Sequence, residues 1–136
     1  MSYPTPALPA NLSYEEAVNL SMELVDFERG LHSPGHSTFH LERMTHLAEF
    51  IGNPHLYTRS IHIAGTKGKG SVAAMTASIL RESGFNVGLT TSPHLNSLRE
   101  RIKINESIIS KLDFIDILRY LWPYVLQVEE KYSYGQ

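Results

Sequence analysis

The residues best suited to chemistry form a short glycine-rich segment in the middle of the chain. They are Gly65, Thr66, Lys67, Gly68, Lys69, Gly70 and Ser71. Glycines let a backbone turn tightly, so that several N–H groups can point toward one anion. Lys69 adds a mobile positive charge suited to the β- and γ-phosphates, and Ser71 offers a hydroxyl where a phosphate loop places one. The segment therefore predicts a site for the phosphates of a nucleotide.

This segment departs from the strict phosphate-loop pattern G-x-x-x-x-G-K-[ST] at two positions. Gly70 stands where Ser or Thr is expected, and the first glycine of the pattern would fall at Ile63. The alternative is a glycine-rich turn that carries two solvated lysines. The flanking elements favour a phosphate loop, because a strand is predicted before it and a helix after it, and the dipole of that helix would face the phosphates.

The elements around the glycine-rich segment predict an α/β fold. Residues 60–64 are a short β-branched run that predicts a strand. Residues 71–83 are rich in Ala, Met, Ile and Leu and predict a helix ended by Gly84, and residues 86–91 predict a second strand. Strand, helix and strand in this order form a βαβ unit with a parallel pair. We expect a phosphate-loop type of parallel sheet with flanking helices.

Two helices are predicted before the glycine-rich segment. Ser13 and Glu16 form a capping box, which begins a helix over residues 14–29. Gly30 is expected to end this helix. The apolar spacing of residues 41–51 predicts a second helix, and a Gly-Asn-Pro turn follows it.

Another helix is predicted near the end of the chain, after an alternating run that indicates a half-buried strand at residues 101–104. Ser110 and Asp113 form a pattern like a capping box, which begins this helix. Pro123 is expected to kink or divide it. Residues 1–12, rich in proline, are then a lead-in arm, and residues 13–136 form the domain.

The composition limits the classes of protein to which the chain can belong. Its 136 residues include no cysteine, which removes thiol catalysis and thiolate metal sites. No apolar run is long enough to span a bilayer and no signal-peptide pattern is present, so we expect a cytoplasmic location and no membrane partner. The net charge of −2 argues against nucleic-acid binding, whereas residues 60–103 carry +4 and favour a small anionic ligand.

Three histidines, His32, His36 and His40, are spaced by four residues and would share one face of a helix. Such a face can bind a metal ion. However, Pro34-Gly35 lies between them and predicts a loop, and no carboxylate completes the set. The residues therefore favour a loop over a metal site.

Three sequence blocks resemble the dihydrofolate synthase/folylpolyglutamate synthase family, a branch of the Mur ligase superfamily. Residues 62–71, His-Ile-Ala-Gly-Thr-Lys-Gly-Lys-Gly-Ser, resemble the nucleotide loop of that family. Residues 91–95, Thr-Ser-Pro-His-Leu, followed by Arg-Glu-Arg-Ile at 99–102, resemble a mobile loop that helps to form the pterin site. A weaker match joins Leu-Glu-Arg-Met at 41–44 to Gly-Asn-Pro at 52–54.

The resemblance implies an ATP-dependent ligase of folate biosynthesis and one-carbon metabolism. ATP would phosphorylate the carboxylate of a dihydropteroate or folate to an acyl phosphate. The amine of L-glutamate would attack the acyl phosphate, releasing phosphate and leaving an amide. The implied cofactors are ATP and Mg²⁺, because the charge of the γ-phosphate must be screened during its transfer.

The resemblance also implies roles for individual residues. The glycine-rich segment would wrap the triphosphate, with Lys69 as the catalytic lysine. Ser92 would bind Mg²⁺, although on the residues alone it favours a turn before Pro93. Substrate contacts are implied for His94, Arg99 and Arg101, with solvated loop charges as the alternative, and for a stretch near the pteroate site. That stretch consists of Gly30, Leu31, His32 and Ser33.

The chain departs from the family in one turn and in its length. The family commonly has Asn-Gly after the alternating strand, whereas Glu106 follows Asn105 here and leaves the turn type open. Because family members are much longer, residues 13–136 are expected to be the N-terminal part of the ATP-binding domain, inactive alone. They would lack the downstream Mg²⁺ ligands and the C-terminal domain, and an open sheet edge would favour self-association. Two alternatives stay open: a Mur-type ligase of cell-wall synthesis, and a nucleotide-binding module without ligase activity.

Overall fold

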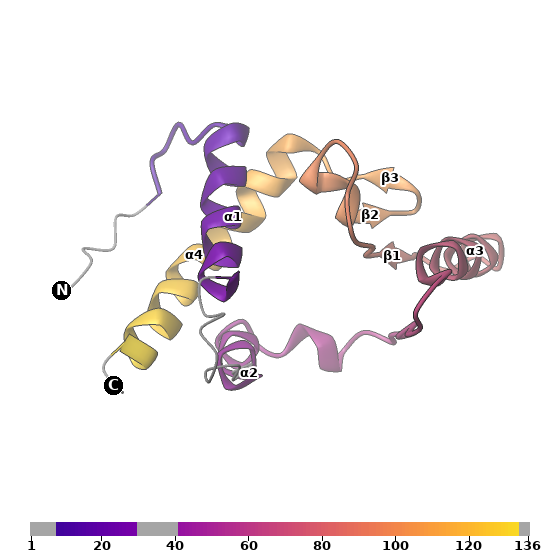
Figure 1. Ribbon diagram of the computed structural model, residues 1–136, viewed down its shortest axis with the longest axis horizontal. Helices are drawn as coiled ribbons and strands as arrows, with labels where there is room; N and C mark the ends of the chain where they lie inside the picture. Colours follow the sequence, from indigo (N-terminus) through magenta and orange to yellow (C-terminus); the bar gives the residue numbers. More distant parts are fainter. Residues whose placement is uncertain (1–7, 30–40, 134–136) are drawn as a thin grey trace. The chain divides into compact units, whose positions relative to one another are not determined.

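The computed structural model of the chain describes residues 8–29 and 41–133, which group into two compact units. The first unit runs up to Arg59 and resumes at Ile115, and we call it the helical unit. The second unit spans Ser60–Phe114 and is called the mixed unit, because it contains a helix and three strands. Figure 1 labels the elements of both units.

In the helical unit, α1 spans Tyr14–Arg29, as the capping box predicts. The backbone N–H of Ser13 donates to the Glu16 carboxylate at 2.8 Å, and the N–H of Glu16 donates to the Ser13 hydroxyl at 3.2 Å. These bonds satisfy two donors that a helix start leaves without partners. The Glu16 carboxylate accepts from the backbone N–H of Ser13 and from its hydroxyl, and these two bonds, the first most strongly, lower the pKa of Glu16.

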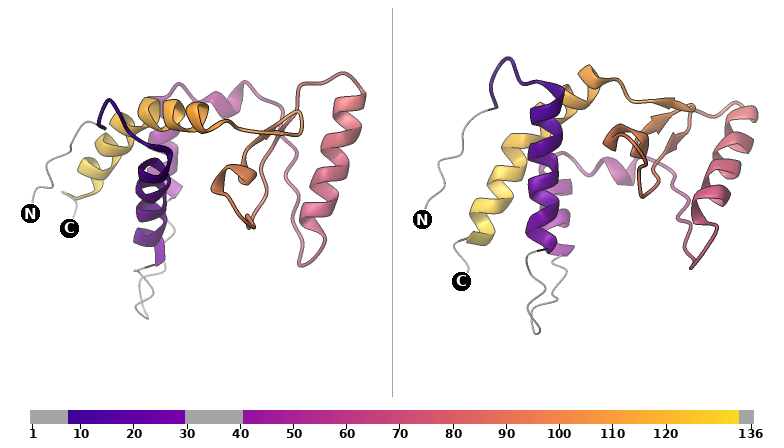
Figure 2. Two further views of the ribbon diagram at one scale, coloured as in Figure 1. Left: turned by 90° about the horizontal axis from the view of Figure 1, so that it is seen from above. Right: turned by 45° about the horizontal axis from the view of Figure 1, so that its top comes forward.

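The last helix, α4, spans Lys111–Ser133 and begins at the predicted cap, where the N–H of Asp113 donates to the Ser110 hydroxyl at 3.0 Å. Pro123 lies inside this helix without dividing it. Figure 2 shows α1 beside α4, and Arg119 of α4 donates to the carbonyl of Ala10 at 2.6 Å. The buried apolar residues of this unit lie around the start of α1 and along α4. They are Leu12, Ala17, Ile115, Leu118 and Val128.

The other helix of this unit, α2, spans Leu41–Phe50 and ends at the predicted turn, where Gly52 adopts a positive φ of 81°. A short 3₁₀ helix, η1, follows at Pro54–Leu56. Side chains join α2 to α4. Arg43 pairs with Glu129 at 3.3 Å, His46 Nδ1 lies 2.7 Å from the Tyr132 hydroxyl, and Phe50 stacks on Tyr124.

In the mixed unit, α3 spans Lys69–Glu82 and begins two residues before the predicted start. Its end is the predicted one, because Gly84 adopts a φ of 88°. The N–H of Gly84 donates to the carbonyl of Arg81 at 2.9 Å, and the N–H of Phe85 donates to the carbonyl of Leu80 at 3.1 Å. This is a Schellman motif, which satisfies carbonyls at the helix end.

The strands of the mixed unit are short and form one antiparallel sheet in the order β1-β2-β3. They span Gly88–Leu89, Lys103–Ile104 and Ser107–Ile108. Gly88 faces Ile104, and Ile104 also faces Ser107 on the other side. Between β1 and β2 lies η2, a 3₁₀ helix at Leu98–Arg101, so the predicted strand at 101–104 begins later than expected.

The predicted parallel pair of strands is absent from the described residues. Residues 60–64 form no strand, and β1, the predicted second strand in a shorter form, pairs with β2 in antiparallel fashion. A strand exists only where a neighbouring strand pairs with its N–H and C=O groups, and no described segment does this for residues 60–64. The strand predicted at residues 60–64 is therefore wrong for the described residues, because a β-branched run cannot supply its own partner.

The turn between β2 and β3 is a two-residue hairpin turn despite the missing glycine. Asn105 has φ of 47° and Glu106 has φ of 71°, as a type I′ turn requires at both central positions. A left-handed φ is unfavourable for Glu, by about 1–2 kcal/mol. Glu106 forms an ion pair with Arg81 of α3, which partly offsets that cost. The turn type that the sequence leaves open is thus the one usual for Asn-Gly.

Candidate functional site

The glycine-rich segment forms a loop that leads directly into the first turn of α3. Gly65 and Gly68 have φ of 153° and 76°, conformations that residues with side chains rarely adopt. Gly68 is the N-cap of α3 and provides no side-chain cap. The N–H groups of the first helical turn, at Lys69, Gly70 and Ser71, therefore face outward at the positive end of the helix dipole. This arrangement suits an anion.

Lys69 is folded back over this loop. Its ammonium group donates to the carbonyl of Gly65 at 2.6 Å, and its side chain stays exposed to solvent. The charge is thereby held beside the outward-facing N–H groups. A phosphate in the loop would offer Lys69 a charged acceptor, which forms a stronger hydrogen bond than a neutral carbonyl. The structure thus brings the predicted residues 65–71 together in one exposed loop and turn.

The predicted metal ligand Ser92 lies in a second loop, between β1 and η2, and its side chain is exposed. The peptide bond from Ser92 to Pro93 is cis. Two residues along, His94 accepts a hydrogen bond at its Nδ1 from the Nε of Arg101, at 2.9 Å. The structure therefore pairs two of the predicted substrate residues with each other.

Arg99, a third predicted substrate residue, is half-buried and donates to the main-chain carbonyl of Ile109 at 2.7 Å. This bond ties η2 to the segment after β3, which gives Arg99 a structural contact within the mixed unit. The remaining predicted substrate stretch, residues 30–33, lies outside the described residues. So do His36 and His40 of the histidine series.

Glu100 is the residue of this region that sequence reasoning missed. Its carboxylate accepts the backbone N–H groups of Leu95, Asn96 and Ser97 at 2.9, 3.0 and 2.8 Å. These bonds, with the one from Leu95 contributing most, hold the pKa of Glu100 below its usual value of 4.5. The signal was present in the sequence, because Ser97 and Glu100 have the spacing of a capping box.

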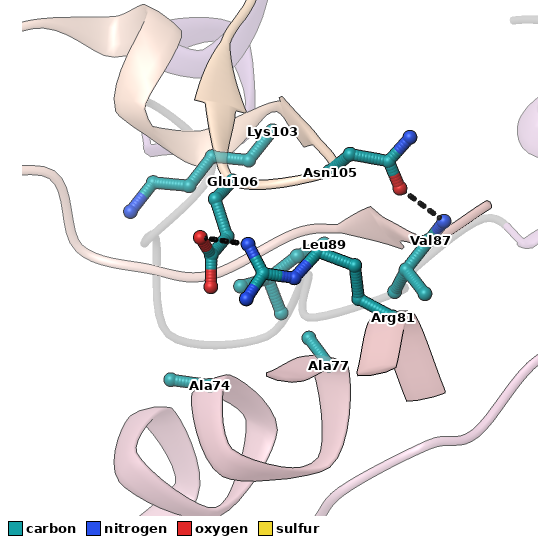
Figure 3. Close-up of a pocket in the computed structure, with 8 residues that line it drawn as sticks. All are labelled: Ala74, Ala77, Arg81, Val87, Leu89, Lys103, Asn105 and Glu106. Carbon is teal, nitrogen blue, oxygen red and sulfur yellow. Dashed lines mark hydrogen bonds and ion pairs between the residues drawn. The ribbon is translucent and has the colours of Figure 1, made fainter. Parts of the chain in front are cut away.

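A separate hollow lies on one face of α3 and contains none of the predicted site residues (Figure 3). Ala74 and Ala77 of α3 line one side of it, and Val87 and Leu89 line another. Arg81 crosses it to pair with Glu106, as the dashed line in Figure 3 shows. Apolar side chains form much of its wall, and the Arg81 side chain within it is paired with Glu106. The chemistry of the unit therefore centres on the two loops.

The described residues lack the features of two other types of site. Among residues 8–29 and 41–133, no three His, Asp or Glu side chains gather as a metal site would require. In the same part of the chain, no helix combines the length and apolar character needed to cross a membrane.

Curated proteins with related sequences share one kind of name. A Dictyostelium discoideum protein named as a folylpolyglutamate synthase is 40% identical to 88% of this chain, which covers 20% of that protein. The Bacillus subtilis dihydrofolate synthase/folylpolyglutamate synthase is 38% identical to 71% of the chain, which covers 22% of it. The chain thus spans about a fifth of the length of these relatives. No family model matches the chain.

Solved structures agree with these relatives. The Mycobacterium tuberculosis folylpolyglutamate synthase complexed with ADP is 30% identical, with a TM-score of 0.75. That match covers 90% of this chain and 26% of the other. A folylpolyglutamate synthase complex with AMPPCP and folate is 29% identical, with a TM-score of 0.73 over 90% of this chain and 28% of the other. The likeness extends over most of the chain.

Proposed function

We infer the function of this protein from its family, because the chain is related to folylpolyglutamate synthase and dihydrofolate synthase. We propose that the protein carrying this chain is an ATP-dependent ligase that joins L-glutamate to the carboxylate of dihydropteroate or folate. One observation of the structure carries the nucleotide part of this proposal. It is the loop of residues 65–68, which leads into α3 with Lys69 held across it.

The proposed reaction needs the loop because a free carboxylate is a poor acylating agent, whose oxygen is a bad leaving group. Transfer of the γ-phosphoryl group of ATP to that carboxylate converts the oxygen into a good leaving group. The outward N–H groups of α3 and the Lys69 ammonium would stabilise the negative charge that is redistributed during the transfer. The amine of L-glutamate then displaces phosphate and forms the amide.

Mg²⁺ belongs to the same proposal, and Ser92 is the residue of this chain proposed to hold it. The exposed hydroxyl of Ser92 is an oxygen donor, the kind of ligand that Mg²⁺ prefers. When bound, the ion would screen the charge of the phosphates. In the same way, His94, Arg99 and Arg101 are proposed to lie near the pterin. His94 and Arg101 form a bonded pair, and Arg99 also donates to the main chain.

The type of domain and the small-molecule partners of the protein are also proposed from the family. We propose that residues 13–136 belong to an ATP-binding domain of the Mur ligase type, in which residues 60–64 would join a parallel sheet. The likeness to solved synthases supports this proposal. The small-molecule partners would be ATP, L-glutamate and a pteroate or folate. The cytoplasmic location and the state of association stay predictions.

The test uses the full-length protein that carries this sequence. It is incubated with ATP, Mg²⁺ and L-glutamate, first with dihydropteroate and then with a reduced folate, and mass spectrometry reports added glutamate. Addition to dihydropteroate identifies a dihydrofolate synthase, and addition to the folate identifies a folylpolyglutamate synthase. If ATP binds while neither pteridine gains glutamate, the folate proposal is wrong. Cell-wall amino-acid acceptors are then tested for the Mur-type alternative.

A further inference from the structure

The loop that carries Ser92 and His94 is held by polar contacts rather than by burial. The side chain of Leu95 is 88% exposed, and those of Ser92 and Pro93 are also exposed, so no apolar packing fixes this stretch. Its backbone is fastened instead by the Glu100 carboxylate, which accepts three consecutive N–H groups. A loop with few buried contacts depends on such bonds for a single conformation.

The three bonds exceed what the capping of η2 requires. A capping box uses one reciprocal pair, here the N–H of Ser97 to the Glu100 side chain and the N–H of Glu100 to Ser97. The bonds from Leu95 and Asn96 lie upstream of η2 and add nothing to that helix. Through these bonds Glu100 also fixes the backbone at Leu95, the residue immediately after His94. The adjacent Arg101 restrains His94 itself through its ring nitrogen.

We propose that Glu100 is a positioning residue, which sets the conformation of the loop from Ser92 to Ser97 so that Ser92 can bind Mg²⁺ beside a nucleotide. The proposal rests on the function proposed above for Ser92. Glu100 itself touches neither metal nor nucleotide and acts through the backbone of the loop. Arg101 has the same kind of role toward His94, because its Nε donates to the ring Nδ1 and so fixes the orientation of the imidazole.

The chemistry of the carboxylate gives a graded set of variants. Its Oε2 accepts the N–H of Leu95, and its Oε1 accepts those of Asn96 and Ser97. Glu100→Gln can keep the oxygen that accepts the N–H groups of Asn96 and Ser97, but it places an amide donor against the N–H of Leu95. Glu100→Ala loses both acceptor oxygens. Glu130→Ala, at an exposed position on α4, is the matched control.

The first measurement is hydrogen exchange of the backbone amides in the full-length protein. In Glu100→Ala the amides of Leu95, Asn96 and Ser97 should exchange faster, and in Glu100→Gln mainly that of Leu95. Residues 69–82 of α3 should keep their protection in both variants, which shows that the fold is intact. If the three amides exchange alike in all variants, Glu100 does not hold the loop and the proposal is wrong.

The second measurement is the affinity for a fluorescent ATP analogue as the Mg²⁺ concentration is varied. Glu100→Ala should raise the Mg²⁺ concentration needed for half-maximal binding by about 10–100-fold, as is typical when a residue that supports a metal ligand is lost. Ser92→Ala should do the same, and the double variant should be no worse than either alone. Independent effects that multiply in the double variant would overturn the proposal.

This design separates the positioning proposal from the proposed ligase activity. A protein that adds glutamate to neither pteridine can still show Mg²⁺-dependent nucleotide binding that requires Glu100, which supports positioning and removes only the folate assignment. Conversely, an active ligase whose Mg²⁺ dependence is unchanged in Glu100→Ala keeps its function and loses the positioning role.

Discussion

The two units of the chain are stabilised in different ways. The helical unit buries apolar side chains at the start of α1 and along α4, including Ala17 at 0% and Val128 at 5% exposure. In the mixed unit, the buried apolar residue among those described is Phe114 at its boundary. The mixed unit relies on polar links, such as the Glu100 carboxylate and the Arg81–Glu106 pair. The residues proposed to do chemistry lie in the unit with little apolar core.

The helix α3 shows why this difference arises. Ala74 and Ala77 face the hollow beside the sheet, whereas Val72, Met75 and Ile79 lie on the opposite face and are 46%, 58% and 67% exposed. The helix is therefore apolar on two sides, and its larger apolar side chains lie on the exposed side. Polar bonds rather than burial hold the two loops. Lys69 donates to Gly65 in the first loop, and the Glu100 carboxylate accepts the backbone N–H groups of the second.

The prediction with the largest effect tests whether the stability of the helical unit depends on its buried apolar side chains. Leu118→Ala removes a buried side chain from α4, and we expect it to lower the free energy of unfolding by about 2–5 kcal/mol. Urea unfolding followed by circular dichroism measures the change. The control is Ile117→Ala at the neighbouring position, which is 47% exposed and should cost about 0.5 kcal/mol. Equal costs at both positions would contradict a core on that face of α4.

The prediction with the next largest effect tests whether the catalytic residues lie in the mixed unit. Lys69→Ala should lower the rate of phosphoryl transfer by about 100-fold, the usual loss when one charge-stabilising donor is removed. Stability should hardly change, since the side chain is exposed. Lys67→Ala, in the same loop, has no such bond to Gly65 and is the matched control. A variant at Lys67 that is as impaired as Lys69→Ala would show that the loop attracts anions only by its overall charge.

A smaller effect separates the two glycines that flank Lys69. Gly68→Ala places a side chain at φ of 76° and should destabilise the loop by about 1–2 kcal/mol. Gly70→Ala lies inside α3, where an added Cβ meets nothing within 4 Å, and should stabilise the unliganded protein by about 0.5–1 kcal/mol. Thermal unfolding without nucleotide measures both. The same sign of change at both positions would contradict the backbone described for the start of α3.

The smallest effect is on pH dependence. The pKa values of Glu16 and Glu100 are both lowered below 4.5 by backbone hydrogen bonds. Such groups stabilise the folded state above that pH, and the contribution is lost as the pH falls through the lowered pKa. Because the mixed unit has little apolar core, its amides at 95–97 should lose exchange protection at a higher pH than those of α1. Simultaneous loss in both units would show that they unfold as one.

A feature of the fold could be predicted from the sequence where the residues that cause it lie close together in the chain. The start of α1 follows from Ser13 and Glu16, which lie within four residues of each other, and the structure confirms it. The glycine loop and the end of α3 at Gly84 are likewise local. The parallel strand at 60–64 was predicted from its β-branched residues, yet strand pairing depends on a distant segment that no local pattern reveals.

The candidate site shows the same limit. The residues of the phosphate loop are contiguous, so their assembly in one turn could be predicted. The contact between His94 and Arg101 crosses a loop, and the carboxylate of Glu100 reaches back to the N–H of Leu95 five residues earlier. The sequence predicts a polar loop up to Glu100 and a strand from Arg101, but it does not show which of these side chains bond to each other and which bond to the main chain.

The hairpin turn at Asn105 and Glu106 has a consequence for how this sequence diverges from its relatives. Glu106 is strained in its left-handed conformation, and its pairing with Arg81 compensates for that strain. The two positions are 25 residues apart in the chain, but the effect of a substitution at one depends on the residue at the other. Where a relative has glycine in the turn, the selection on the arginine is relaxed, so we expect positions 81 and 106 to covary among homologues.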